Sequence, residues 1–428
     1  MDFKEYPSYK DSGVEWLGEV PEHWEQKPIW SMFTRTKRTN HPNELLLSVY
    51  RDYGVIPKNS RDDNHNRASE DLTPYQLVKP NDLVINKMKA WQGSIAISEY
   101  QGIVSPAYYI YEPKQTYCSN YIHHLIRSVY FIQSYKNFSK GIRVNQWDLE
   151  HDAFTHINLL LPPLLEQQQI VSFLDSETSR IDNLIVKQEK LIEVLKEHRK
   201  SVISHAVTKG LNPNVPMKNS DVEWLGEVPE HWEIIQSKFY FSERQEKADI
   251  NDKQLTASQK YGIIFQEDYM AENGRLMVVI KNPEILKKVR PNDFVISMRS
   301  FQGGLELSHL EGSISSAYVM LKPNLEVINV EYFKHLFKTN RYIQALQSTS
   351  TLIRDGQALR FNNFSQVKLV LAPLHEQNDI IDYIDEKCRK IDSLIFKQRE
   401  LIKKLKEYRT SIISHAVTGK IDVRDLVA

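Results

Sequence analysis

The sequence predicts an α+β protein in which two globular domains are separated by two long antiparallel coiled-coil helices, the whole forming a pseudo-twofold internal repeat. At 428 residues the chain is too long for one ordinary domain. The twelve letters VEWLGEVPEHWE occur at residues 14–25 and again at residues 222–233. Residues 161–211 align without gaps to residues 371–421, and about half of these positions are identical. A spacing of 210 residues is far above that of solenoid repeats, so the repeated unit is a whole domain plus a helix.

The globular part of each repeat mixes strand and helix signals. Short apolar runs such as DLVIN and DFVIS alternate with Pro, Gly and Asn, and helical stretches are expected near residues 120–138 and 330–346. We expect a first globular domain over residues 1–160 and a second over residues 212–370, which begins with the polar, proline-bearing linker NPNVPMKNS. The segments between the matched motifs have diverged almost completely. Two copies that retain the matched motifs but differ between them suit a protein with two related modules for different targets. The alternative is simple duplication followed by drift.

A long helix is expected after each domain, over residues 161–211 and over residues 371–428, the latter with a C-terminal tail. LPPL or LAPL precedes it, and Glu166 or Glu376 falls in the first turn, where a carboxylate interacts favourably with the helix dipole. Apolar side chains then recur with a heptad period that offers each helix a stripe for the other. Position a falls on Leu174, Ile181, Gln188, Leu195 and Val202, and on Ile384, Ile391, Gln398, Leu405 and Ile412. Position d falls on Ile170, Glu177, Leu184, Leu191, His198 and His205, and on Ile380, Lys387, Leu394, Leu401, Tyr408 and His415.

Connectivity predicts that the two helices pair antiparallel. At 1.5 Å per residue each helix is about 65 Å long, which exceeds the span of a compact domain. The start of the second helix must therefore lie near the end of the first. We expect Leu174 to face the stretch from Tyr408 to His415, and Gln188 and Gln398 to form polar layers that help to fix the register. The rod would then set the distance between the two domains.

Composition restricts the class of protein. Lys+Arg and Asp+Glu both number 55, so no overall positive field marks a nucleic-acid binder, although a local basic face is compatible with neutrality. Two cysteines cannot build a disulfide framework or a thiolate zinc site. The sequence has no apolar run of about 18 residues and no signal-peptide core, so we expect a cytoplasmic protein without a membrane partner.

Catalytic and cofactor motifs are missing from the sequence. It contains no G-x-x-x-x-G-K-[ST] phosphate loop, no G-x-G-x-x-G after a strand, and no N-P-P-[FY] methyltransferase motif. His123, His124, His151 and His156 lack the spacing of a metal site. We therefore expect no catalytic, cofactor-binding or metal-binding residues in this chain, and no enzymatic activity of the chain alone.

Three kinds of segment could contact nucleic acid. Basic residues beside aromatic ones can bind a phosphate backbone, and Arg, Asn and Gln can read G and A edges bidentately. The candidate residues are Arg35, Lys37, Arg38, Lys87, Lys89, Arg143, Asn145 and Gln146 in the first repeat, and Arg299, Arg354, Gln357 and Arg360 in the second. The alternatives are an ordinary surface strand for the first group, a structural role for Trp91, Gln92 and Gly93, and polar loops around residues 141–146 and 353–363.

The repeated motifs resemble a known family. VEWLGEVPEHWE, NKMKAWQG with GIVSPAYY downstream, and LPPLLEQQQI at the start of a long helix are similar to the specificity subunit of type I restriction–modification enzymes. The second copy departs modestly, with SMRSFQG and SISSAYVM at the matching places. The resemblance covers nearly the whole chain in the order of the family, but recognition residues cannot be carried over by motif.

That resemblance implies a division of labour. Two target-recognition domains each read one half of a split double-stranded DNA site, and the helices separate the domains and dock two modification subunits. Those subunits bind S-adenosylmethionine and methylate adenine, while restriction subunits use ATP and Mg²⁺ to translocate and cut DNA. Two other readings remain: a non-enzymatic tandem-domain DNA-binding regulator and a coiled-coil scaffold. Neither the half-site sequences nor the spacer length follows from the sequence.

Overall fold

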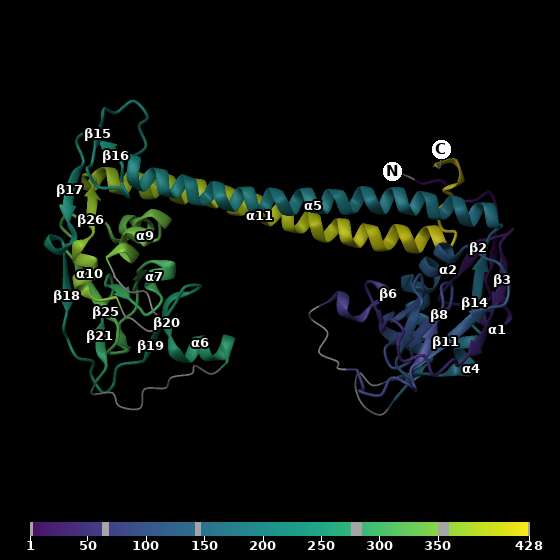
Figure 1. Ribbon diagram of the computed structural model, residues 1–428. Coiled ribbons are helices and arrows are strands. Elements are labelled where there is room, and N and C mark those ends of the chain that lie inside the picture. The colour runs from purple at the N-terminus through teal and green to yellow at the C-terminus, as the bar shows by residue number, and fades with distance from the viewer. Residues whose placement is uncertain (1–2, 62–67, 142–146, 275–284, 350–358, 427–428) are drawn as a thin grey trace. The chain divides into compact units, whose positions relative to one another are not determined.

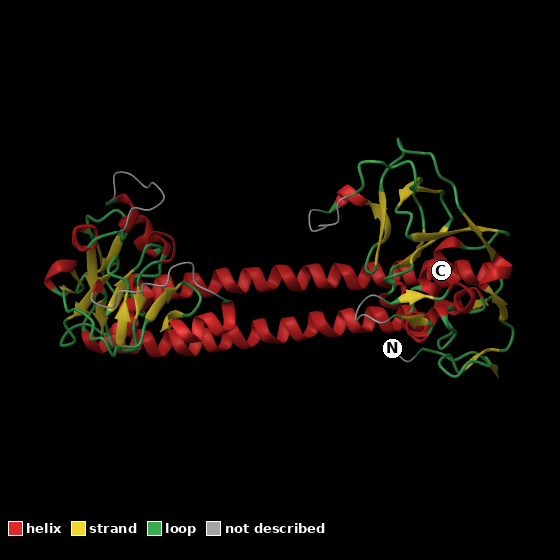
Figure 2. Cartoon of the chain, turned by 90° about the horizontal axis from the view of Figure 1, so that it is seen from below, coloured by secondary structure: helices red, strands yellow, loops and turns green. Residues whose placement is uncertain are grey.

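The computed structural model describes residues 3–61, 68–141, 147–274, 285–349 and 359–426. It divides into unit 1, residues 1–188 with 399–428, and unit 2, residues 189–398. Each unit joins one α+β globular part to segments of the long helices α5 (Leu164–Lys209) and α11 (Leu374–Val417) (Figure 1). Strands occur only in the globular parts (Figure 2). The α+β class, the repeat and the two long helices are confirmed, but each compact unit draws on both repeats.

Unit 1 is built on a four-stranded antiparallel sheet whose alternate residues face two cores. The strand order is β4 (Phe33–Thr36), β11 (Tyr108–Pro113), β8 (Leu83–Asn86) and β9 (Ile95–Ile97). Leu83 and Ile85 enter the main core, while Val84 between them enters a smaller one, as the two-residue period of a strand requires. Antiparallel pairs surround this sheet: β1 (Tyr9–Asp11) with β2 (Glu19–Pro21), β3 (Glu25–Pro28) with β14 (Asn158–Leu161), β5 (Leu47–Tyr50) with β6 (Gly54–Pro57), β7 (Gln76–Val78) with β10 (Gly102–Val104), and β12 (Ser139–Lys140) with β13 (Asp148–Leu149). The short helices are α1 (Ile29–Met32), α2 (Ser119–Ile126), α3 (Val129–Asn137), α4 (His151–Thr155), η1 (Lys58–Ser60), η2 (Ala90–Gln92) and η5 (Arg424–Leu426).

Unit 2 repeats this plan. Its sheet has the order β18 (Phe241–Arg244), β25 (Val319–Pro323), β22 (Phe294–Ile296) and β23 (Glu306–Leu307). The surrounding pairs are β15 (Met217–Asn219) with β16 (Glu227–Pro229), β17 (Glu233–Gln236) with β26 (Lys368–Leu371), β19 (Leu255–Ser258) with β20 (Gly262–Phe265), and β21 (Lys287–Val289) with β24 (Gly312–Ile314). The helices are η3 (Ser237–Phe239), α6 (Gln266–Asn273), α7 (Ser300–Gly303), α8 (Val330–Leu336), α9 (Asn340–Ser348) and α10 (Phe361–Gln366). The repeat seen in the sequence is thus a repeat of topology.

The long helices run antiparallel within each unit. In unit 1 the Tyr121 hydroxyl donates to the carbonyls of Leu160, just before α5, and Val417, at the end of α11. Further along, Arg409 of α11 forms an ion pair with Asp182 of α5 at 2.9 Å. Leu174 shares a core with Tyr408 and Ile412, as the connectivity argument predicts. Unit 2 has the matching ion pair, Arg199 to Asp392 at 3.2 Å.

The d positions of the heptad assignment are wrong in the middle of each helix. Position a lies in the seam, with Ile181 and Ile391 buried and Gln188 and Gln398 half-buried. The d residues near the helix starts, Ile170 and Ile380, are buried as expected, but in the middle the seam takes the next residue along. Ile185, Ile192 and Ile395 are buried and Ile402 is partly buried, whereas Leu191, Leu394 and Leu401 are 40%, 44% and 41% exposed and Leu184 is half-buried. The helix pair therefore presents leucines outward.

The repeated motif VEWLGEVPEHWE builds a socket for helix ends. In unit 1 the buried Glu166 carboxylate of α5 accepts hydrogen bonds from Trp24 Nε1 at 2.9 Å and from Tyr6 Oη at 2.8 Å, and His23 Nε2 lies at 2.8 Å. Gly419, just after α11, packs so closely on Pro21 and Trp24 that a Cβ atom would clash. One socket thus holds the start of one long helix and the end of the other.

Unit 2 has the equivalent socket. Trp232 Nε1 and His231 Nε2 lie 3.0 Å and 2.6 Å from the Glu376 carboxylate of α11, and Gly210 after α5 packs against Trp232. Lys209 donates to the carbonyls of Leu225 and Glu227, as Lys420 does to those of Leu17 and Glu19 in unit 1. In both units the twelve identical letters thus fasten the start of one long helix and the end of the other.

Acid is expected to destabilise unit 1 more than unit 2. Burial, and next the charge of Arg127, lowers the pKa of His124 to about 4 and that of His123 to about 3. Unit 2 has one such residue, His335, whose pKa burial lowers to about 4. The unfolded chain binds these protons below about pH 6.5 and the folded units do not, so stability falls as the pH drops from about 6.5 toward 4. Urea unfolding at several pH values should show this, and an unchanged pH dependence in His123→Gln/His124→Gln would contradict the assignment.

Candidate nucleic-acid interface

Four side chains of unit 1 form a cationic–aromatic platform: Arg35 on β4, Lys87 after β8, Tyr109 on β11 and His151 at the start of α4. The Arg35 guanidinium lies 4.2 Å from the centroid of the Tyr109 ring, and Lys87 Nζ lies 5.7 Å from the same centroid. Arg35 is exposed and the other three are half-buried. A guanidinium over an aromatic face gains cation–π attraction and loses little of its ability to donate hydrogen bonds.

His151 contacts both Tyr109 and Tyr111 and so links the platform to the core of unit 1. Its Nδ1 lies 2.7 Å from the Tyr111 hydroxyl, its ring stacks on Tyr111, and its edge contacts Tyr109. Burial and next the nearby Arg35 charge lower the pKa of His151, which favours the neutral form of the ring. Lys87 Nζ forms an ion pair with Asp148 at 2.9 Å, which raises the pKa of Lys87. Tyr109 and His151 were absent from the sequence-predicted set.

The same place in unit 2 has the opposite chemistry. β4 pairs with β11 as β18 pairs with β25, and this common register puts Glu243 where Arg35 lies and Val319 where Tyr109 lies. Phe361, the first residue of α10, stands where His151 begins α4. An exposed cation over an aromatic ring is thus replaced by a half-buried carboxylate, which lies 3.9 Å from Lys287 Nζ.

The remaining candidates of the first repeat lie in different environments. Lys37 is exposed after β4, and Lys89 is exposed just before η2. Arg38 is 17% exposed and forms ion pairs with Glu112 and, at 2.6 Å, with the buried Asp82. In unit 2 Arg244 makes the equivalent contact with the buried Asp293, at 2.7 Å. The guanidinium of Arg38 is therefore used to neutralise the carboxylate in the turn before β8.

The second-repeat candidates and the polar segments around residues 141–146 and 353–363 give less information. Arg299 and Arg360 are exposed before α7 and α10, and the backbone of Arg360 takes part in the start of α10. Arg143, Asn145, Gln146, Arg354 and Gln357 lie outside the described residues.

The Trp91–Gly93 segment has a structural role. Trp91 packs on Trp147 with ring centroids 5.0 Å apart. Gly93 ends η2 with φ of 93°, and a Cβ there would lie 2.9 Å from Ile132. This position accordingly requires glycine.

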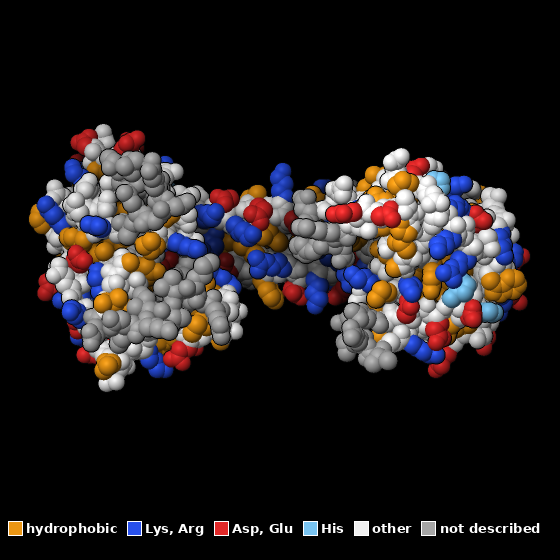
Figure 3. Space-filling model, turned by 60° about the horizontal axis from the view of Figure 1, so that its bottom comes forward, with side chains coloured by type: hydrophobic (Ala, Val, Ile, Leu, Met, Phe, Trp, Pro, Cys, Tyr) orange, Lys and Arg blue, Asp and Glu red, His pale blue; other side chains and the backbone are white. Residues whose placement is uncertain are grey.

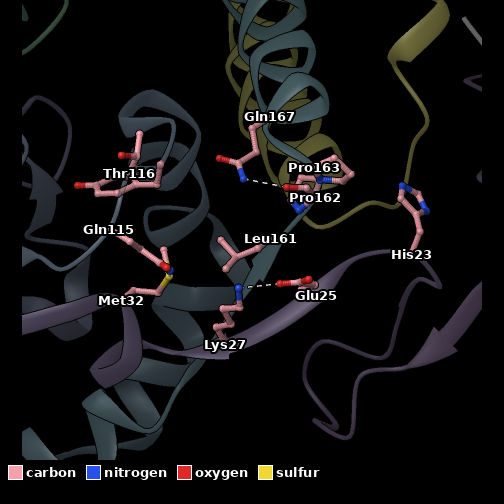
Figure 4. Close-up of a pocket in the computed structure, with 11 residues that line it drawn as sticks. His23, Glu25, Lys27, Met32, Gln115, Thr116, Leu161, Pro162, Pro163 and Gln167 are labelled. Carbon is pink, nitrogen blue, oxygen red and sulfur yellow. Dashed lines mark hydrogen bonds and ion pairs between the residues drawn. The ribbon is translucent and has the colours of Figure 1, made fainter.

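A polar cavity of about 360 Å³ opens in unit 1 where α5 begins (Figure 4). Around it, Lys27 pairs with Glu25 at 2.7 Å, and Gln167 Nε2 donates to the Pro162 carbonyl at 2.8 Å. These polar groups satisfy one another, so the cavity belongs to the helix start rather than to a reaction centre.

Surface charge is mixed. In the view of Figure 3, Lys and Arg side chains are interspersed with Asp and Glu over both globular parts. Within the ranges that the structure describes, no cluster of His, Cys, Asp and Glu could hold a metal ion. Over the same ranges no helix is both long and apolar enough to cross a bilayer.

Comparison with known proteins gives consistent matches. A family model described as the type I restriction modification DNA specificity domain matches residues 21–195. The chain is similar to the putative type I restriction enzyme MjaX specificity subunit of Methanocaldococcus jannaschii, with 25% identity over 95% of this chain and 96% of the relative. It is 27% identical to the MjaVIII specificity subunit of the same organism, over 95% of each chain.

Two solved structures share the fold. The HsdS subunit from Thermoanaerobacter tengcongensis aligns with a TM-score of 0.53 and 14% identity over 96% of this chain and all of that one. A chain from a structure concerned with complex assembly and conformational transition of the type I R-M system gives a TM-score of 0.59 and 15% identity over 93% and 98% of the two chains. The chain is thus similar over nearly its full length to type I restriction–modification specificity subunits, which are not themselves catalytic, and the family model matches within residues 21–195.

Proposed function

We propose that this chain reads a bipartite double-stranded DNA site for a type I restriction–modification complex. Residues 1–160 and 212–370 act as target-recognition domains, one for each half-site. Residues 161–211 and 371–428 form the helices that set the spacer and dock two modification subunits. Those subunits use S-adenosylmethionine to methylate adenine, and restriction subunits use ATP and Mg²⁺ to cut DNA, all in the cytoplasm.

The observation that carries this proposal is a contrast within the repeat. The sockets at the helix ends are retained in both units, whereas the side chains at one position of the sheet differ. The sockets around Trp24 and Trp232 share their tryptophan and histidine partners and the acceptor carboxylates of Glu166 and Glu376. The side chains at one sheet position, in contrast, change from Arg35 to Glu243. Base edges are distinguished by donor and acceptor patterns, so two units with opposite chemistry on one frame suit two different half-sites.

The outward leucines support docking of the modification subunits. Leu184 and Leu401 in unit 1 occupy the same heptad position as Leu394 and Leu191 in unit 2. All four are leucine, and Leu191, Leu394 and Leu401 are exposed while Leu184 is half-buried. Solvent-accessible apolar residues that both copies retain indicate a partner that binds each unit in the same way. We call these four side chains the outer leucine face.

The alternatives predict different partners. A tandem-domain regulator would bind its operators without modification subunits, and a scaffold would bind protein without DNA. For the proposed complex, duplex binding should weaken with salt and strengthen when the modification subunit is added. The chain alone, with S-adenosylmethionine, ATP, Mg²⁺ and DNA, should neither methylate nor cut.

The test is a map of methylated adenines made by the reconstituted complex. Seven residues inserted after both Gln188 and Gln398 keep the heptad phase and lengthen each helix by about 10.5 Å. That corresponds to about three base-pair steps, so the same half-sites should appear with a spacer longer by about three. Seven residues inserted into the linker at residues 212–216 serve as the control and should leave the spacer unchanged. A bipartite motif with an unaltered spacer in the helix variant would contradict the role of the helices.

A further inference from the structure

We propose that Arg35 reads a guanine in the half-site of the first unit, and that Tyr109 and His151 are the residues that position it. This inference rests on the proposed function, since it assigns part of the recognition to named side chains.

The geometry of Arg35 favours base reading over an internal role. Among the described residues no ion pair of Arg35 is found, whereas Arg38, three residues on, is committed to Asp82 and Glu112. Arg35 is exposed, and its guanidinium is held 4.2 Å above the Tyr109 ring. Stacking restrains the planar group while its N–H donors stay available for two acceptors side by side. Guanine presents such a pair, N7 and O6, in the major groove.

The positioning residues form a continuous support. Tyr109 is held edge-on by His151, and His151 is fixed by the Tyr111 hydroxyl at 2.7 Å. Tyr111 is 1% exposed and lies in the main core of unit 1. The orientation of Arg35 is thereby tied to the core, which lowers the conformational entropy lost when the side chain binds.

Comparison with unit 2 argues against a general phosphate contact. A phosphate contact carries no sequence information, and both units would need it. The equivalent residues are Glu243, whose carboxylate is paired with Lys287 at 3.9 Å, and Val319, and neither of these two can donate a hydrogen bond to a phosphate through its side chain. A group present in one unit and reversed in charge in the other is suited to specificity.

The experiment maps adenine methylation by the complete complex with Arg35→Ala, Arg35→Lys and Tyr109→Leu. For Arg35→Ala we expect one G·C position in one half-site to relax by roughly 5-fold to 150-fold, with the other half-site unchanged. Arg35→Lys should restore only part of this, since an ammonium is not a bidentate fork. Tyr109→Leu should relax the same position, and Tyr109→Phe, which keeps the ring, should rescue it.

The controls separate three outcomes. Arg51→Ala removes an exposed arginine of the same unit that pairs with Asp52, and it should leave the motif unchanged. If the unaltered complex gives a bipartite motif and Arg35→Ala reads the same motif, the inference about Arg35 fails while the proposed function stands. A uniform loss at all sites, or relaxation at an A·T position, also overturns it. If the unaltered complex shows no bipartite motif, the proposed function itself fails.

Discussion

The double substitution Leu184→Glu with Leu401→Glu is expected to release one modification subunit from the complex and leave the other bound. Both residues belong to the outer leucine face of unit 1, and Leu401 is 41% exposed. Burying a leucine at an interface contributes about 1.5–3 kcal/mol, so losing two costs roughly 3–6 kcal/mol. That corresponds to a dissociation constant raised about 100-fold or more. Native mass spectrometry should show one modification subunit per chain instead of two.

The matched variants test the symmetry of the outer leucine face. Leu191→Glu with Leu394→Glu should have the same effect through unit 2, and all four changes together should abolish binding and methylation. Val186→Glu is the control, since Val186 is 62% exposed on α5 but lies at another heptad position. Glutamate is a good helix former, so the helices themselves should be unaffected. Two bound subunits in the fourfold variant would place the docking surface elsewhere.

Glu166→Ala is expected to destabilise unit 1 by about 3–5 kcal/mol, because it removes the acceptor for Trp24, Tyr6 and His23 from a buried site. The Glu166 side chain is 6% exposed, and burial, followed by the charge of Glu166, raises the pKa of Tyr6. Water cannot easily replace the lost carboxylate, so the Trp24 indole N–H and the Tyr6 hydroxyl are left without an acceptor. Urea unfolding of the full chain should show the transition of unit 1 at lower denaturant.

Glu376→Ala is the internal control for that change. The Glu376 side chain is 28% exposed and accepts from His231 and Trp232, with no third donor among the described residues. Water can reach the vacated site, so the expected loss is about 1–2 kcal/mol, in unit 2. Equal destabilisation by the two substitutions would mean that burial is not what makes the unit 1 socket stronger.

The organisation of the chain could be predicted well because its two repeats could be compared with each other. The helix beginning after Pro163, the antiparallel pairing and the α+β domains follow from repeats, proline positions and connectivity. The outward leucines could not be foreseen. Each is followed by isoleucine, as in Leu191-Ile192 and Leu401-Ile402, and a heptad pattern cannot decide which of two adjacent apolar residues faces the partner helix. Only the packing of the other helix makes that choice.

The candidate interface was predicted in part. Arg35 and Lys87 were found from composition, but Tyr109 and His151 are remote in sequence and meet Arg35 only through strand register. Arg38 looked equivalent to Arg35 because the sequence does not show that Asp82 needs a cation. Its counterpart, Arg244, stands two residues earlier relative to the strand, so alignment alone does not reveal the shared role.

The sockets also have a consequence for biosynthesis. Unit 2 is one uninterrupted stretch, residues 189–398, and can close its core as soon as that stretch leaves the ribosome. Unit 1 needs residues 399–428 to cover Trp24 and Leu174, although most of it is translated first. At about 5–20 residues per second the delay is roughly 10–40 s. During that interval the globular part of unit 1 carries an open apolar socket, so the last turn of α11 closes a unit whose globular part was translated before unit 2.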